Sequence, residues 1–278
     1  MDQPVMTFNR RGLRNFAILS IGSALAVSLI FFYGTSLRDP AFLDGWLLAV
    51  GMLVLTLYNL RKKMPAVPLL SASAWLQIHV HVGILCALLF LIHTEFRLPN
   101  GMLEMLIWIV FVLVIVSGGI GLFLSRQLPA RLNARGERVI FERIAGLQAK
   151  LANEARDLAV RMAQESGSRA TADFYDNRLH AYLTNSRNFW CHLFGSDAAM
   201  RRQRAAIKEL HRYQDANGRA ILNELDAIVV AKDNLEHQHA LQFALKIWLF
   251  VHIPLTYSVL LLSVVHIVLV YAFASGAP

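Results

Sequence analysis

The sequence has 278 residues, of which 56% are hydrophobic and only 17% are charged, with a mean hydropathy of +0.45 and a formal net charge of +8. These values exclude an ordinary soluble globular domain and indicate an integral membrane protein with a polar segment. The two cysteines, Cys86 and Cys191, are too few and too far apart for a disulfide framework or a thiolate-held cluster.

Five apolar stretches are long enough to cross a bilayer, which takes about 20 helical residues. They lie at 15–35, 42–60, 74–95, 102–125 and 241–274. The first begins like a secretory signal, but its apolar run continues, so an uncleaved span is expected. Lys and Arg are concentrated in the N-terminus, the second loop and the segment after the fourth stretch, whereas the first and third loops hold only Arg38 and Arg97. We therefore expect a bacterial-type inner (plasma) membrane protein with a cytoplasmic N-terminus and a periplasmic C-terminus.

The polar segment, 126–240, carries 18 of the 27 Lys and Arg residues and 14 of the 19 Asp and Glu residues, so its charge is mixed. Its apolar residues recur with helical periodicity, which predicts two or three amphipathic helices. Gly195 and Asp197 are expected to end one helix and begin the next. From Asp197 the helical pattern runs toward the fifth stretch with Gly218 as a weak interruption. The expected organisation is 1–125 for four membrane helices, 126–240 for a cytoplasmic helical insert and 241–278 for the fifth membrane helix.

Four histidines in the third and fifth stretches repeat one spacing. His79 and His93 are 14 residues apart, and so are His252 and His266. At about 1.5 Å and 100° per residue, the members of a pair are roughly 21 Å apart along the helix and within roughly 40° of the same face. Since both helices are expected to run outward, His79 should be level with His252 and His93 with His266. Each level then offers two imidazoles, the ligands of a six-coordinate haem iron.

A single histidine in a membrane helix more often packs or forms a hydrogen bond than binds a metal. Ionisable groups are costly there, however, and four at one repeated interval favour a shared ligand role. His81 lies on a different helical face from His79, and its 12-residue spacing to His93 has no counterpart in the fifth stretch. We predict two b-type haems on the four repeated histidines, with His81 as a neighbour, a quinone-site group or a packing residue.

Small and cationic residues near these levels are candidates for the cofactor pocket. Gly118 and Gly119 would let a porphyrin approach the backbone, although small residues also serve ordinary packing between membrane helices. Arg97 on the outer side, with Lys246 and Arg126 on the inner side, are candidates for binding the haem propionates. For Lys246 and Arg126, snorkelling to the interface is the stronger alternative.

With these histidines, the third and fifth stretches resemble the bundle of dihaem membrane b-type cytochromes. This group includes cytochrome b of the quinol–cytochrome c oxidoreductases and the membrane domain of ferric reductases and NADPH oxidases. The resemblance covers 42–125 and 241–274. It implies haems in a four-helix core, and the whole chain is expected to be an all-α bundle of five transmembrane helices with a helical insert between the fourth and fifth.

Several features of the two groups are missing here. The further spans and quinol-site loop of the first group are not found, and the flavin and nicotinamide module of the second is not found after the fifth stretch. No GxGxxG or GxxxxGKS loop occurs, and no CxxCH motif would attach a haem covalently. The chain is therefore expected to exchange electrons with quinone or with other redox subunits.

The expected function is that of an electron-transfer subunit rather than a complete enzyme. Its expected partners are quinone, membrane lipid and a c-type cytochrome, iron–sulfur or flavin protein, and nucleic acid is not among them. A haem-dependent membrane sensor or anchor that signals through the insert is the alternative. The insert could also dock a soluble subunit or form a dimerising rod. Its five histidines lack a four-ligand spacing, so a metal site there is not expected.

Overall fold

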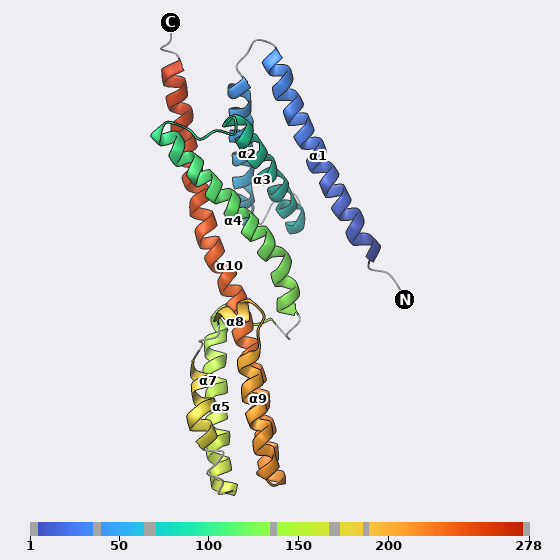
Figure 1. Ribbon diagram of the computed structural model, residues 1–278, viewed down its shortest axis with the longest axis vertical. Helices are drawn as coiled ribbons and strands as arrows, with labels where there is room; N and C mark the ends of the chain where they lie inside the picture. Colours follow the sequence, from blue (N-terminus) through green and yellow to red (C-terminus); the bar gives the residue numbers. More distant parts are fainter. Residues whose placement is uncertain are drawn as a thin grey trace. The chain divides into compact units, whose positions relative to one another are not determined.

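The computed structural model describes residues 5–35, 40–63, 71–133, 138–166, 173–185 and 189–274. These residues form helices and turns and no strand, so the all-α prediction is confirmed for the described chain (Figure 1). The chain divides into two compact units. Unit 1 comprises 1–122 and 251–278, and unit 2 comprises 123–250. The segment predicted as an insert, 126–240, lies within unit 2.

Unit 1 contains three whole helices, α1 (Val5–Thr35), α2 (Pro40–Lys63) and α3 (Ala72–His93), which pack against one another (Figure 1). It also contains the first part of α4 (Met102–Asn133) and the last part of α10 (Ala216–Ala274). At its centre the rings of Phe90 and Phe111 stack with centroids 4.2 Å apart. The other buried residues of this core are Ile30, Leu48, Met52, Cys86, Leu89 and Val259.

Four helices are long and apolar enough to cross a bilayer, and they coincide with four of the five predicted stretches. These are α2, α3, α4 and α10. The first predicted stretch lies in α1, whose apolar part among the described residues, Ser20–Thr35, is shorter than a full span. Large apolar side chains such as Phe32, Leu113 and Val264 are between 47% and 68% exposed on the surface of unit 1. Lipid is the solvent in which such a surface is favourable, so the chain is a membrane protein.

Unit 2 is a helical body with its own core. It contains α5 (Phe141–Ser166), η1 (Tyr175–Leu179), α7 (His180–Thr184), α8 (Phe189–Leu193), α9 (Ala198–Leu210) and η2 (His211–Tyr213), together with parts of α4 and α10. The predicted apolar faces are confirmed, because Leu158, Leu222, Leu225 and Val229 are buried together. Such burial, rather than intrinsic propensity, supplies most of the stability of helices of this length.

The predicted boundary before α9 is confirmed in position but not in its contacts. Gly195 has a φ of +83°, a conformation in which glycine avoids the clash of a Cβ atom. Asp197 occupies the N-cap position of α9, but its side chain makes no capping hydrogen bond and pairs with Arg201 instead.

The prediction of one helical pattern running from Asp197 into the fifth stretch is wrong. Helix α9 ends at Leu210, the single turn η2 follows, and α10 begins at Ala216. The Asp215 carboxylate accepts a hydrogen bond from the Gly218 N–H at 2.8 Å, which satisfies a free donor of the first turn. Gly218 therefore does not interrupt α10, and the break lies at the preceding polar residues. From Ala216 onward α10 runs for 59 residues, through Pro254.

Candidate functional site

His93 on α3 and His266 on α10 lie together in unit 1. Their ring centroids are 6.5 Å apart and their planes are inclined at 87°. An imidazole nitrogen binds a metal ion at about 2 Å, so two imidazoles on opposite sides of one ion have centroids roughly 6 to 7 Å apart. The separation of this pair lies within that range.

Asp44 on α2 holds the ring of His93. The Nδ1 atom of His93 lies 2.7 Å from Asp44 Oδ1, and the carboxylate side chain is only 5% exposed. A histidine that donates Nδ1–H to a carboxylate keeps the lone pair of Nε2 available, which is the usual arrangement for a metal ligand. Gly45 adds close approach, because a Cβ atom there would lie 3.1 Å from Cε1 of His93.

A cavity of about 490 Å³ opens beside these rings. Its volume lies within the range of about 300–1,000 Å³ that small-molecule and cofactor sites occupy. Most of its wall is apolar and aromatic, with polar groups at a few points. Residues that line it, in addition to the two histidines, include Trp46, Met52, Phe90, Arg97, Glu104 and Tyr271. The wall is braced across the bundle, since Trp46 Nε1 donates to the Tyr271 hydroxyl at 3.0 Å.

The chain turns sharply just after His93. Glu95 and Phe96 have φ values of 50° and 58°, in the left-handed region that non-glycine residues rarely adopt. The Phe96 N–H donates to the carbonyl of Leu91 at 3.0 Å, which holds this turn on the end of α3. The turn brings Arg97 to the rim of the cavity, where its guanidinium lies 3.3 Å from Glu95.

The second pair, His79 and His252, interacts electrostatically between α3 and α10. Ser117 holds His252, with Oγ 2.7 Å from Nδ1, while the same hydroxyl donates to the Val114 carbonyl at 2.9 Å. The Ser117 oxygen is thus the acceptor for His252 Nδ1–H. His79 lies against the ring of Tyr58, with centroids 5.1 Å apart.

The remaining predicted residues lie in different settings. A Cβ atom at Gly118 would lie 3.9 Å from His252 Cε1, whereas one at Gly119 would meet nothing within 4 Å. Lys246 belongs to unit 2, where its Nζ donates to Glu142 at 2.7 Å and lies over the Phe141 ring. His81 Nδ1 is 2.6 Å from the backbone carbonyl of Gln77 on its own helix.

Asp44, Gly45 and Ser117 were not among the site residues predicted from the sequence. A signal was present for Asp44, because a carboxylate inside a predicted span is costly and marks a functional residue with a partner. Its partner, His93, is 49 residues away in the chain and could be assigned only from the packing of α2 on α3.

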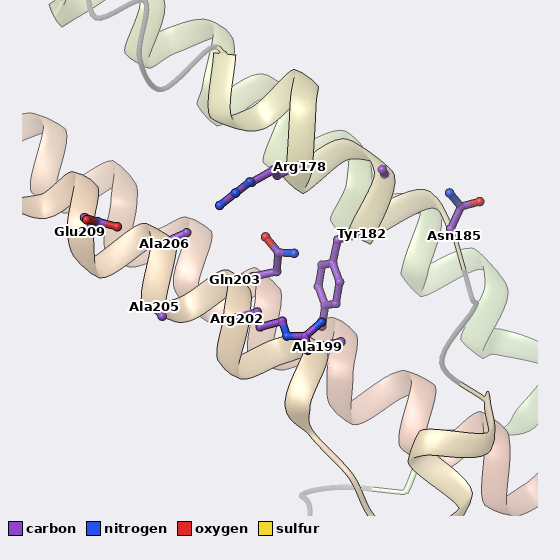
Figure 2. A pocket seen from close by; sticks show the side chains of 10 residues that line it. Arg178, Tyr182, Asn185, Ala199, Arg202, Gln203, Ala205, Ala206 and Glu209 are labelled. Carbon is purple, nitrogen blue, oxygen red and sulfur yellow. The ribbon is translucent and has the colours of Figure 1, made fainter.

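Unit 2 holds a second histidine pair and a second cavity. His192 and His237 lie 6.3 Å apart and are almost fully buried. No group of three or more His, Cys, Asp or Glu residues suited to a metal ion occurs among the described residues. The cavity is a groove of mixed polarity, into which Arg178 and Tyr182 point from η1 and α7 and Gln203 points from α9 (Figure 2).

Comparison with protein-family models, with curated proteins and with solved structures finds no match to this chain. A function for this chain can therefore be proposed only from the geometry of its site.

Proposed function

We propose that this chain is a membrane b-type cytochrome that holds two haems between α3 and α10 and carries electrons between quinone and a partner redox protein. The observation that supports it best is the pair His93 and His266. Their rings lie 6.5 Å apart on an apolar cavity of about 490 Å³, and one of them is oriented by a buried carboxylate. The partner would be a c-type cytochrome, an iron–sulfur protein or a flavin protein.

The residues present fit a haem better than a hydrolytic metal ion. The level of His93 and His266 offers two imidazoles and a largely apolar wall, and Gly45 leaves room for the imidazole of His93. A haem held by two imidazoles exchanges single electrons and has no open position for bond chemistry. Asp44 and Ser117 would fix the orientation of one imidazole at each level. The aromatic wall would exclude water, and Arg97 at the rim would be available to a propionate.

The two levels are roughly 21 Å apart along each helix, so an electron that passes from one to the other crosses most of the bilayer. Moving one charge across a potential of 100 mV involves about 2.3 kcal/mol, which couples such a transfer to the membrane potential. The chain's own contribution is to hold both ligand sets at fixed depths on two continuous helices.

The spectrum of the purified protein tests the proposal. We expect two b-type haems per chain by extraction, and reduction of both by a quinol analogue. A preparation without a Soret band would contradict haem binding, and is the result expected of a metal transporter with intramembrane histidines. Haem that exchanges no electrons with a quinol or with a partner protein would favour the sensor.

We also propose five membrane spans, with the N-terminus and the helical insert in the cytoplasm. The distribution of Lys and Arg supports this arrangement. Alkaline phosphatase fused after Asn100 should be active, because that loop would face the periplasm, and the same enzyme fused after Asn133 should be inactive. The reverse pattern would contradict the topology.

A further inference from the structure

Several strongly exposed apolar side chains of unit 2 lie near one end, whereas Val160 and Tyr213 are exposed elsewhere on the unit. In the described part of 126–240, large apolar residues that are exposed include Ile140 at 62%, Trp190 at 66% and Phe194 at 82%. These three come from the start of α5 and from α8 with the turn after it. An exposed cluster with aromatic members marks a contact surface rather than ordinary surface variation.

At this end of unit 2, the sequences of helices α4 and α10 become apolar. Phe189, beside Trp190, packs edge to face against Phe243 of α10 with centroids 5.5 Å apart. Along α10, Phe243 is followed by the exposed residues Ile247 and Phe250. The cluster is therefore level with the part of α10 at which the predicted fifth apolar stretch, 241–274, begins.

The contacts of helix α4 with α8 also place the cluster at this end of unit 2. Arg131, eight residues after the exposed Phe123, donates to the backbone carbonyls of Leu193 at 2.8 Å and His192 at 3.1 Å. These bonds tie the C-terminal end of α8 to α4 at a point about 12 Å of helix beyond Phe123. The charged groups nearest to it on α4, Arg126 and Arg131, suit the phosphate region of a bilayer.

We infer that Ile140, Trp190 and Phe194 form an interfacial anchor that inserts into the headgroup region of the bilayer that α4 and α10 enter. The Trp190 and Phe194 rings are nearly parallel, with centroids 6.5 Å apart, so they present one apolar face. Tryptophan favours this region because its ring is apolar and its N–H can reach water or headgroups. The anchor holds unit 2 to the membrane surface and does not depend on haem binding.

Spin labels in reconstituted nanodiscs test the anchor. Phe194→Cys carries the label in a Cys86→Ala, Cys191→Ala background, and accessibility is measured to oxygen, which partitions into lipid, and to a water-soluble nickel chelate. Tyr213→Cys is the matched control, since Tyr213 is 79% exposed and lies beyond the far end of α9. We expect oxygen to be the better relaxant at 194 and nickel to be the better relaxant at 213.

Equal nickel accessibility at the two positions would overturn the proposal. Protection of position 194 from both relaxants would overturn it as well, because protein rather than lipid would then cover the surface. If Phe194→Cys does not fold, the spin label is placed at Ile140→Cys, directly before α5. The expected result and the two results that would overturn the proposal are then the same.

Discussion

Two histidine pairs in this protein have nearly the same ring geometry in opposite surroundings. His93 and His266 in unit 1 are 6.5 Å apart at 87°, and His192 and His237 in unit 2 are 6.3 Å apart at 79°. The first pair lines a cavity. The second is packed, with exposed fractions of 1% and 3%. Ring separation alone therefore does not identify a pair of ligands.

The partners of the nitrogens explain the difference. His93 uses Nδ1 for Asp44, which leaves Nε2 for a ligand role. His192 uses Nε2 for Glu236, at 3.1 Å, and Glu236 also pairs with Lys232 Nζ at 2.7 Å. Lys232 donates in turn to the Tyr182 carbonyl. Each of these two histidines has one nitrogen held by a carboxylate, but His192 is buried within its network, whereas His93 has a cavity beside it and is therefore suited to bind a cofactor.

The largest contrast is expected between alanine variants of the two pairs. His93→Ala should remove one of the two haems while unit 2 stays folded, because only the unit 1 ligand is lost. His192→Ala should keep both haems and destabilise unit 2. Haem extraction per chain and hydrogen exchange of the α5 and α9 amides measure the two effects. Two haems remaining in His93→Ala would falsify the ligand assignment, and His81→Ala is the control that should lose none.

The second-largest effect is expected when Lys232, the cation of the buried network, is replaced. Lys232→Met leaves Glu236 and Asp233 in a site without their counter-charge, which costs about 3–5 kcal/mol for buried pairs of this kind. Burial already lowers the pKa of Lys232, and the neighbouring carboxylates oppose that shift. We expect a large loss of thermal stability in unit 2 with an unchanged haem spectrum. An unchanged melting profile would mean that the network contributes nothing to stability.

A smaller effect is expected from the groups that orient the ligands. Asp44→Asn replaces a carboxylate acceptor by a weaker one, so His93 becomes a poorer donor to ferric iron and one haem potential should rise. Changes to a group that hydrogen-bonds a metal ligand typically alter metal affinity by about 10–100-fold, and each factor of ten in relative affinity for the two oxidation states is about 59 mV. Redox titration should show a shift of one haem only. Ser117→Ala is the paired variant, and it should move the other haem; a shift of the same haem by both variants would contradict the two-level arrangement.

The smallest effect is expected at the exposed pair of Glu142 and Lys246. The hydrogen bond from Lys246 lowers the pKa of Glu142 below its ordinary value of 4.5. Because the folded pKa is the lower one, the pair stabilises the fold above the ordinary pKa, and this contribution is lost as the pH falls through the folded value. Glu142→Gln should therefore lower the melting temperature slightly at pH 7 and by less at pH 3. An equal loss at both pH values would indicate a packing effect.

Much of the fold could be predicted because its signals are local. The apolar lengths of α2, α3, α4 and α10 and the helical periodicity of α5 follow from hydrophobicity and helix geometry. The break at η2 was missed because its signal is one capping residue, Asp215, in a strongly helical context. Helix propensity is a weak local preference, and a single side-chain bond to the backbone can outweigh it.

The sequence by itself determined the membrane character, the helical class and the matching intervals of His79, His93, His252 and His266, because composition and periodicity are properties of the chain alone. Only the tertiary structure decided that Asp44 holds His93, that Ser117 holds His252, and that the paired histidines of unit 2 belong to a packed network. Each of these depends on a contact between helices distant in the chain, and such contacts are set by side-chain packing, which leaves no periodic trace in the sequence.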